Sequence, residues 1–493
     1  MTGSMDATYR CVRCHSPLVA QEGEGLSCPV CTADYPTVGG IKVLTLKPHR
    51  LIQAHVGRVP ERRQELADQR EKLSAQGEVD SPQGWVRALQ GYDGLLANLE
   101  VVEQSLQPAR EYLASHPARK GLLDDFLLES AWPSFHMLGY FYRDWGGTDE
   151  ARFVTDLFTG AVQRHGEGER DRVAVLGCGA CRLVHDLGEL FSTVYGVDLA
   201  FDSLLLARAL LEGGELDLSF NFPRPQLPIA QKVVRVQGPA QKHDGIELVT
   251  ADVSRLPFSS SSLRYVLSQY LLDIVPSPNK MISEIRRVLA PGGIWINFSN
   301  LSDDNSPPEV RSYDQVNNLD LSSFLRKSGF ALREESMHRF TLLDLSSVSE
   351  WALTNTESPI FFVAQKDTLA PEPRDLFAEY FARQGDGVWS LAPRLASPVS
   401  MIQERIFTAG GIQEGKRIRF SGSSRALSND MALLAEGLLR MIDGTRTLGE
   451  MFGGLKENYG NLIGEEDFLG LFSELSDVGL IALTAPSEPP RPR

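Results

Sequence analysis

The stretch that most constrains the fold is residues 171–211, DRVAVLGCGACRLVHDLGELFSTVYGVDLAFDSLLLARALL. Residues 172–176, RVAVL, are apolar after the first residue and predict a buried strand. Gly177 and Gly179 follow this run directly, which indicates a tight turn where the backbone approaches a ligand closely. A helix is then predicted from near Arg182. The stretch therefore predicts a strand, a ligand-facing turn and a helix in succession.

A second strand, residues 194–197, ends in Asp198, about twenty residues beyond the first glycine. In nucleotide-binding α/β sheets an acid at this place accepts hydrogen bonds from ribose hydroxyls. A later string, ELVTADVSRLPF, predicts a strand that ends in Asp252. Across residues 151–367 such runs alternate with helical patterns, which is typical of a parallel α/β sheet. A Gly-x-Gly pair alone is a weak signal, and the order of the surrounding elements strengthens it.

This order resembles the class I S-adenosylmethionine-dependent methyltransferases, which have a Rossmann-like sheet. LRYVLSQYLLDIV corresponds to their fourth strand and substrate-side loop, and MISEIRRVLAPGGIWINFS to the next helix, a Pro-Gly-Gly turn and the fifth strand. A dehydrogenase or another Rossmann-like domain is the alternative. The resemblance implies S-adenosylmethionine as cofactor, with Asp198 at the ribose and Asp252 at the adenine. The residues expected to bind the cofactor are Gly177, Cys178, Gly179, Arg182, Asp198, Asp252, Val253 and Gln269.

Cys178 and Cys181 form a Cys-x-x-Cys pair on the expected cofactor turn. Cys181 stands where many of these enzymes have glycine. We expect both side chains to pack as small apolar groups against the cofactor, with metal binding or redox chemistry as the alternative.

Several strings within residues 135–367 resemble the carnosine N-methyltransferase family. They are FYRDWGGTDEAR, the Arg-Leu that follows the cofactor turn, YLLDIVPSP, PGGIWIN and SPIFFVAQK. The residues that carry the resemblance are Arg143, Asp144, Trp145, Arg152, Arg182, Leu183, Asp273, Trp295 and Asn297. The resemblance implies N-methylation of an imidazole-bearing substrate.

Two departures limit what carries over from that family. After the Trp-Ile-Asn strand the family has a Leu-Tyr-His segment whose His helps to build the substrate site, whereas this chain has FSNLSDDN. The acid after the second strand is Asp198, where the family uses Glu, and either acid can bind ribose. The expected acceptor is therefore an imidazole-like or other nitrogen of a peptide or small molecule, with carnosine itself less favoured.

The resemblance also implies roles for residues around the acceptor. We expect Asp273 to accept a hydrogen bond from the second imidazole N–H and to stabilise the cation that forms, with a loop cap as the alternative. Tyr270 is the other expected catalytic residue. Asn297 and Tyr313 are expected to line the substrate pocket.

Other polar and aromatic residues near these motifs are expected to be structural. His338 is expected to be an ordinary surface or strand residue. Asp303 and Asp304 are expected in a solvated loop, although they could attract a cationic substrate. An aromatic cluster is expected in the core, where it could also cap the site: Trp132, Phe135, Tyr140, Phe141 and Tyr142.

Residues 8–47 contain two Cys-x-x-Cys pairs, CVRC and CPVC, formed by Cys11, Cys14, Cys28 and Cys31. Four thiolates in two such turns suit one tetrahedral zinc ion, with iron as the lesser alternative. No coordination position is left open, so the zinc is expected to be structural. The module resembles the zinc ribbons beside several methyltransferases. It would either dock a substrate or partner, or act as a folding staple.

Four further segments are predicted. Residues 50–150 are a helical cap or linker region, residues 151–367 the methyltransferase domain, and residues 368–399, which include Pro371, Pro373 and Pro393, a linker. Residues 400–484 form a small winged-helix-like domain with helices at about 430–441, from Thr447 and from Glu465. Its Ile-Asp-Gly-Thr-Arg-Thr run resembles peptide-chaperone domains of modified-peptide biosynthesis, which bind a leader peptide as an added strand. DNA binding, dimerisation or simple packing are the alternatives.

The net charge of −15 weighs against a nucleic-acid substrate, because phosphate contacts require a basic surface. No apolar run is long enough for a membrane helix and no signal core is evident, so a cytoplasmic protein is expected. The sequence thus predicts an S-adenosylmethionine-dependent N-methyltransferase, with natural-product biosynthesis as one setting. An RNA base methyltransferase and a non-catalytic cofactor-binding scaffold are the alternatives.

Overall fold

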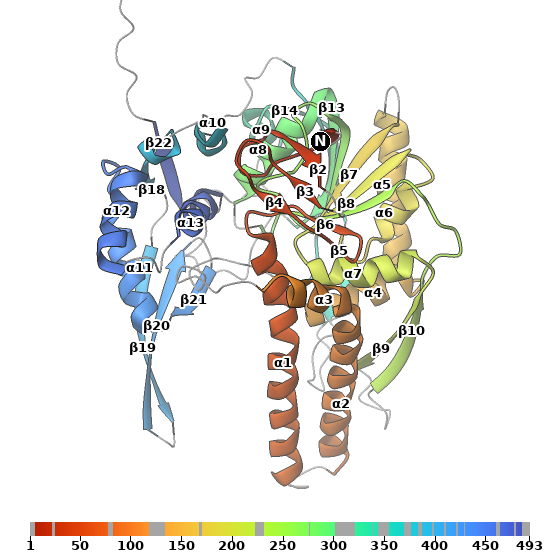
Figure 1. Ribbon diagram of the computed structural model, residues 1–493. Coiled ribbons are helices and arrows are strands. Elements are labelled where there is room, and N and C mark those ends of the chain that lie inside the picture. The colour runs from red at the N-terminus through yellow and green to blue at the C-terminus, as the bar shows by residue number, and fades with distance from the viewer. Residues whose placement is uncertain are drawn as a thin grey trace, which may run out of the picture.

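A nine-stranded mixed sheet runs through the centre of the molecule (Figure 1). Its strand order is β14-β17-β13-β12-β7-β8-β11-β6-β5. The strands are β5 (Thr37–Val38), β6 (Ile41–Val43), β7 (Arg172–Leu176), β8 (Thr193–Asp198), β11 (Ile246–Thr250), β12 (Leu263–Gln269), β13 (Leu289–Ser299), β14 (Phe330–Met337) and β17 (Ile360–Lys366). The six consecutive strands β13, β12, β7, β8, β11 and β6 pair in parallel, as predicted. At the two ends of the sheet β17, β14 and β5 pair antiparallel with their neighbours.

The computed structural model describes residues 5–21, 25–76, 82–117, 134–166, 170–221, 231–275, 277–300, 321–338, 340–343, 354–368, 376–382, 387–396, 399–408, 411–420, 423–427, 429–459, 464–477 and 480–485. None of the helices in these ranges combines the length and apolar character needed to cross a membrane.

Both faces of the sheet are covered, and β7 shows how. Val173 and Val175 face one apolar cluster, while Ala174 and Leu176 face the other. This explains why the strand is continuously apolar from Val173 to Leu176, as buried parallel strands are. The first cluster is closed by α5 (Asp149–His165), α6 (Arg182–Leu187) and α7 (Phe201–Leu211), and the second by α8 (Pro278–Val288) and α9 (Leu321–Lys327).

The N-terminal cysteine-rich segment is divided between two sheets. Its first part forms a separate antiparallel sheet of β1 (Met5–Arg10), β2 (Pro17–Ala20), β3 (Leu26–Ser27) and β4 (Asp34–Tyr35). Its last part, β5 and β6, extends the central sheet, with Lys42 opposite Val249 and Val43 opposite Thr250. The sequence analysis expected one separate module over residues 8–47, whereas β5 and β6 belong to the central sheet. Strand β6 pairs the otherwise open edge of β11 and buries two apolar side chains, Ile41 and Val43.

A long helical hairpin projects from the sheet, formed by α1 (Pro48–Gln76) and α2 (Pro82–Ser105) (Figure 1). The shorter helices α3 (Gln107–Ser115) and α4 (Ser134–Trp145) follow it. A β-hairpin that the sequence analysis did not predict, β9 (Glu215–Asn221) with β10 (Gln231–Gln237), packs against α2. Asn98 fixes this contact, because its side chain accepts from the Ser219 N–H at 2.7 Å and donates to the Ser219 carbonyl at 2.8 Å.

The C-terminal part contains helices where the sequence predicts them: α11 (Asn429–Met441), α12 (Leu448–Tyr459) and α13 (Glu465–Asp477). The remaining strands are β15 (Phe340–Leu343) with β16 (Thr354–Glu357), β18 (Ala392–Leu395) with β22 (Ile481–Thr484), and the sheet of β19 (Val399–Thr408), β20 (Gly411–Phe420) and β21 (Ser423–Leu427). The winged-helix assignment stays a prediction.

The segment predicted as a linker, residues 368–399, contains regular structure. It carries α10 (Leu376–Ala382), the short 3-10 helix η2 (Val388–Ser390) and β18. Phe377, Val388 and Leu391 are buried in a third apolar cluster with the C-terminal helices. The prolines suggested an open linker, but burial of these apolar side chains joins much of the segment to the C-terminal unit.

Candidate active site

The expected cofactor turn lies at the carboxyl end of β7, where the chain passes to α6. Gly177 and Gly179 have φ angles of 65° and 51°, a backbone region that favours glycine. A side chain at Gly177 would meet Leu271 within 3.3 Å. The Gly177 and Cys178 N–H groups both donate to the Val197 carbonyl, at 2.9 and 3.2 Å. The turn is therefore tied to the neighbouring strand β8.

Asp198 ends β8 and is tied to the same turn. Its Oδ2 accepts the Gly179 N–H at 2.8 Å and its Oδ1 accepts the Ala200 N–H at 2.9 Å. Burial raises the pKa of the Asp198 carboxyl, although these backbone donors and that of Leu199 oppose the rise. Each carboxylate oxygen has more than one acceptor site, so hydroxyl groups of a ligand can still bind there.

Asp252 and Val253 follow β11 at the same edge. Thr250 is the sheet partner of Asp198, which brings the segment after β11 beside the cofactor turn. The Asp252 Oδ1 accepts the Ser254 N–H at 2.7 Å, which folds the segment into a tight turn. Val253 is buried. Gln269 ends β12, on the other side of β7.

The Arg-Asp-Trp motif at the end of α4 contacts the cofactor turn directly. The Trp145 Nε1–H donates to the Ala180 carbonyl at 2.8 Å. Arg182 Nη1 donates to the Asp144 carbonyl at 3.2 Å, and its Nε pairs with Asp186 at 2.8 Å. The side chain of Arg182 is thus used to hold α4 against α6. Its expected contact with the cofactor stays a prediction.

The loop after β12 begins with Tyr270, whose φ of 46° is unusual for a residue with a side chain. The Tyr270 N–H donates to the Phe298 carbonyl at 2.7 Å, and its hydroxyl donates to Glu150 Oε1 at 3.2 Å. Asp273 lies in the same loop, half-buried. Strained backbone of this kind costs roughly 1–3 kcal/mol and tends to occur at functional sites. Glu150, on α5, thus contacts the loop of the candidate site, and no sequence pattern singled it out.

Asn297 lies beneath this loop rather than at its surface. Its side chain has no exposed area. The Asn297 Oδ1 accepts the hydroxyls of Ser268 and Ser299 at 2.8 and 3.3 Å. Ser299 Oγ in turn accepts the N–H groups of Leu271 and Leu272 at 3.0 and 3.3 Å. Asn297 therefore organises the loop, and its expected contact with substrate stays a prediction.

His338 comes closer to the site than the sequence analysis expected. It follows β14, whose end lies beside the carboxyl end of β13 across β17. Its ring packs 5.2 Å from Phe153 and 6.0 Å from Phe298, measured between ring centroids. Burial lowers the pKa of His338. Only the pairing of three distant strands brings this histidine here, so no local pattern signalled it.

Several expected residues lie outside the described part of the chain: Trp132, Asp303, Asp304 and Tyr313. The side chain of Phe135 is also outside it. In the remaining aromatic cluster Phe141 is fully buried, whereas Tyr140 is 41% exposed with Arg143 stacked 4.8 Å above its ring.

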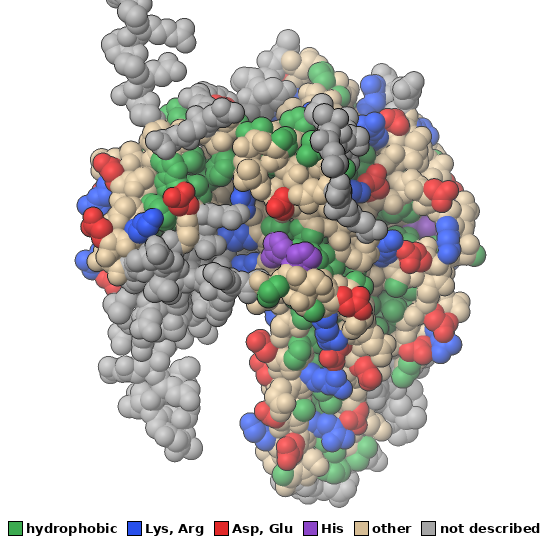
Figure 2. Space-filling view, viewed as in Figure 1, with side chains coloured by type: hydrophobic (Ala, Val, Ile, Leu, Met, Phe, Trp, Pro, Cys, Tyr) green, Lys and Arg blue, Asp and Glu red, His purple; other side chains and the backbone are tan. Residues whose placement is uncertain are grey.

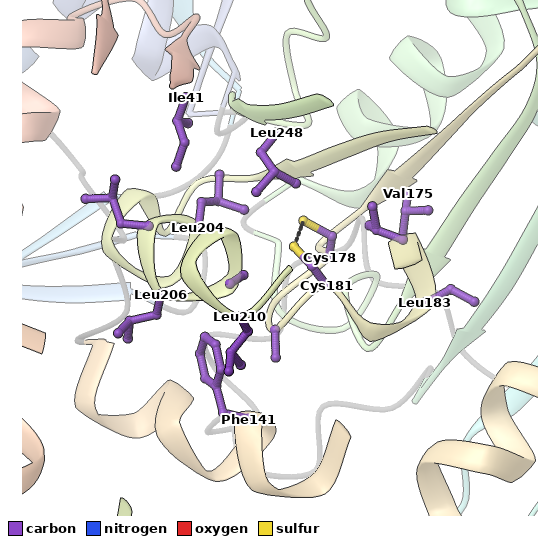
Figure 3. Close-up of a cluster of buried hydrophobic side chains, with 14 of the residues drawn as sticks. Ile41, Phe141, Val175, Cys178, Cys181, Leu183, Leu204, Leu206, Leu210 and Leu248 are labelled. Carbon is purple, nitrogen blue, oxygen red and sulfur yellow. Dashed lines mark hydrogen bonds between the residues drawn. The ribbon is translucent and has the colours of Figure 1, made fainter. Parts of the chain in front are cut away.

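Cys178 and Cys181 lie among apolar side chains behind the turn, with Sγ atoms 3.6 Å apart (Figure 3). Figure 3 shows them beside Val175 and Leu248. Burial raises the pKa of Cys178 well above the ordinary thiol range. This disfavours the reactive thiolate and supports the packing role expected for the pair.

The other four cysteines converge at the N-terminus. The sulfur atoms of Cys11, Cys14, Cys28 and Cys31 all lie within 4.8 Å of one another. Two of the Sγ–Sγ distances are 3.4 Å, against about 3.8 Å for thiolates around tetrahedral zinc. This donor set fits a zinc ion, because zinc prefers four thiolates in this arrangement.

The strand order and the turn are those of a doubly wound α/β domain, whose candidate site lies at the carboxyl ends of the neighbouring strands β7 and β12, where the strand order reverses. Residues 175–297 match the family model described as a methyltransferase domain. Residues 175–297 therefore belong to a methyltransferase domain.

Similar proteins are also methyltransferases. An uncharacterized chloroplastic methyltransferase of Arabidopsis thaliana is 27% identical over 172 residues, which are 34% of this chain and 46% of that protein. A demethylmenaquinone methyltransferase of Bacillus velezensis is 30% identical over 114 residues, 23% of this chain and 45% of that protein. A methyltransferase structure from Methanosarcina mazei is 16% identical with a TM-score of 0.29, covering 42% of this chain and 96% of that chain. The chain spans less than half the length of the two curated relatives.

Proposed function

We propose that the chain is an S-adenosylmethionine-dependent N-methyltransferase that acts on an imidazole-like or other nitrogen of a peptide or small molecule. The observation that carries the proposal is the contact between the Gly179 N–H and Asp198. It joins the glycine turn to the acid at the edge where the expected cofactor binds. In the proposal Asp198 accepts the ribose hydroxyls, and Asp252 and Val253 hold the adenine. Gly177, Cys178, Arg182 and Gln269 complete the cofactor site.

S-adenosylmethionine, when bound, supplies an electrophilic methyl group. The residues of the loop after β12 orient the acceptor so that its lone pair faces that group. Asp273 accepts a hydrogen bond from the second N–H of an imidazole, which fixes the tautomer and stabilises the developing cation. Tyr270, held by Glu150, borders the same space. Alignment and exclusion of water are the main contributions of such a site.

An apolar rim favours an acceptor larger than a small zwitterion. Phe153, Ile274 and Met337 are 37%, 48% and 67% exposed. Phe153 belongs to α5, Ile274 to the loop after β12, and Met337 to the end of β14. These three elements border the same edge of the sheet. Large exposed apolar side chains next to a site often mark a ligand or partner surface. A histidine-containing peptide, which carries apolar neighbours beside its imidazole, suits this rim.

We further propose that the four N-terminal cysteines bind a structural Zn²⁺ ion. The convergent Sγ atoms support it. In addition, the Arg13 N–H points at Cys11 Sγ at 3.4 Å and the Cys31 N–H at Cys28 Sγ at 3.5 Å. Such N–H groups stabilise thiolates. The cysteine module and the C-terminal domain are the proposed surfaces for substrate or a protein partner.

An RNA base methyltransferase is the less favoured alternative. On the face in Figure 2, acidic and basic side chains alternate along the α1–α2 hairpin and form no basic stripe. Several of these charges pair with one another, as Arg63 does with Glu103 and Arg70 with Asp93. Phosphate binding needs unpaired, clustered cations. A non-catalytic scaffold is the other alternative.

The deciding experiment is calorimetric binding of S-adenosylhomocysteine to the wild type and to Asp198→Ala. Micromolar binding that the variant loses would support the cofactor site. Transfer of a labelled methyl group to histidine-containing peptides would then support the acceptor class. Absence of binding by folded, zinc-loaded protein, with and without such a peptide, would overturn the methyltransferase proposal. Binding without transfer to any nitrogen acceptor would favour the scaffold.

A further inference from the structure

The segment after β11 that carries Asp252 and Val253 is hydrogen-bonded on one side to α8. Glu284 Oε2 accepts the Leu256 N–H at 2.7 Å. Arg287 donates to the carbonyls of Leu256 and Phe258, both at 2.7 Å, and pairs with Glu284 at 2.6 Å. All of these contacts are buried. The far end of the segment is therefore anchored to the body of the domain.

The same segment is hydrogen-bonded on its other side to the cysteine module. The Arg10 N–H donates to the Pro257 carbonyl at 2.9 Å, and Tyr9 forms a β-bridge with Phe258. Tyr9 is 1% exposed and its hydroxyl donates to Glu247 of β11 at 2.8 Å. The module thus pairs with the segment through backbone as well as side-chain contacts.

Arg255 contacts the first Cys-x-x-Cys turn directly. Its Nη1 donates at 3.1 Å to the carbonyl of Val12, which lies between Cys11 and Cys14 in the first Cys-x-x-Cys turn. Arg255 is 2% exposed, so its guanidinium depends on such acceptors in place of water. The Arg255 N–H in turn donates to the Asp252 carbonyl at 2.9 Å. One residue therefore connects the Cys turn with the acid expected at the adenine.

We propose that zinc in the four-cysteine site and cofactor at the Asp252 segment favour each other's binding, and that Arg255 is the positioning residue that links them. The inference rests on the proposed function. Zinc fixes the Cys11–Cys14 turn and with it the Val12 carbonyl. Without the metal that turn loses its constraint, Arg255 loses a defined acceptor, and the Asp252 segment must be ordered when the cofactor binds. Ordering of that kind lowers affinity.

Thermodynamic linkage makes the proposal measurable from both ends. If zinc raises the affinity for S-adenosylhomocysteine by a given factor, then S-adenosylhomocysteine must raise the affinity for zinc by the same factor. We expect a factor of about tenfold, within the usual range for coupled sites. The first measurement is calorimetric titration of zinc-loaded and chelator-stripped full-length protein with S-adenosylhomocysteine. The second is competition for zinc by a chromogenic chelator, with and without saturating S-adenosylhomocysteine.

Variants distinguish coupling through Arg255 from a general effect of zinc on the stability of the fold. Arg255→Met keeps most of the side-chain volume and removes the donors, so we expect both factors to fall to about one. Arg13→Met is the matched control. It removes an arginine of the same Cys turn, whose side chain donates to the Leu46 carbonyl at 3.0 Å. The control should keep the full factor. Arg255→Lys, which retains a charged donor, should keep part of it.

Equal affinities for S-adenosylhomocysteine in zinc-loaded and stripped wild type, both folded by circular dichroism, would overturn the proposal. So would a factor that persists in Arg255→Met, because it would show that the metal acts through overall stability. If Arg255→Met does not fold, the chelator competition on wild type and Arg255→Lys still decides. Failure of zinc-loaded wild type to bind S-adenosylhomocysteine at all would overturn the proposed function instead.

Discussion

The Gly179 N–H donates to the Asp198 carboxylate across 2.8 Å, from the turn after β7 to the end of β8. Asp198 therefore has a structural task before any ligand binds, since it holds the turn in the shape that the two glycines permit. Its second oxygen is held by the Ala200 N–H. Five predictions concern this contact and its surroundings.

Replacing Asp198 by Asn should weaken S-adenosylhomocysteine binding by about 10²–10³-fold. Hydrogen bonds to a charged group contribute about 1.5–3 kcal/mol each, and two ribose hydroxyls are involved. Calorimetry measures the loss. Asp217→Asn is the control, because Asp217 is an exposed acid on β9 paired with Arg235 and lies outside the site. Equal binding by wild type and Asp198→Asn would contradict the ribose role.

Cofactor affinity should fall as the pH is lowered, beginning above the pH at which an ordinary aspartate protonates. Burial raises the pKa of Asp198, and only the ionised carboxylate accepts two ribose hydroxyls fully. Affinity is therefore complete above that raised pKa and is lost as the pH drops through it. The stability of the cofactor-free protein should change in the opposite direction and rise on acidification, because the native state holds this proton more tightly than the unfolded chain.

The rise in melting temperature caused by S-adenosylhomocysteine, measured across pH, tests this dependence. The rise should shrink on acidification in the wild type. In Asp198→Asn it should be small and flat. A wild-type profile parallel to that of the variant would assign the titration to another group.

Trp145→Phe should weaken cofactor binding by about two- to tenfold, because the variant loses the hydrogen bond to the Ala180 carbonyl while keeping an aromatic ring. The turn would then be held less firmly between α4 and β8. Trp389→Phe serves as the control, since Trp389 packs on Phe452 and Phe468 in the C-terminal unit. Identical cofactor affinities of the two variants would show that the Arg-Asp-Trp motif does not contribute to cofactor binding.

Asp273→Asn should lower kcat for methyl transfer to a histidine-containing peptide by about 10²-fold, with cofactor affinity unchanged. The amide cannot neutralise a developing cation, and removing one electrostatic group from such a site typically has this effect. Asp244→Asn, an exposed acid just before β11, should leave kcat unchanged. A loss of peptide affinity without a change in kcat would point to a binding role instead.

Asn297→Leu should destabilise the protein by about 1–3 kcal/mol, because the buried hydroxyls of Ser268 and Ser299 would lose their shared acceptor. Urea denaturation measures the change. The loop that carries Tyr270 and Asp273 would also loosen, since Ser299 holds its N–H groups. Full stability combined with loss of methyl transfer would show instead that Asn297 meets the substrate directly.

The parts of the site that could be predicted from the sequence are those in which neighbours along the chain decide the geometry. The apolar run of β7, the glycines at 177 and 179, and the acid that ends β8 are each local signals. The Cys-x-x-Cys pairs are equally local, and their sulfur atoms do converge. The Arg-Asp-Trp motif was found by resemblance alone, and its contact with the turn appears only in the folded chain.

The sequence by itself determined the nucleotide-binding sheet, the turn and the convergence of four cysteines, because period, glycine and spacing act over a few residues. Only the tertiary structure decided that residues 41–43 pair with β11, that His338 packs against Phe153 and Phe298, and that Arg255 joins the Cys turn to Asp252. The reason is physical. These contacts join residues far apart in the chain, and they form because open strand edges and buried polar groups must find partners wherever the fold brings them.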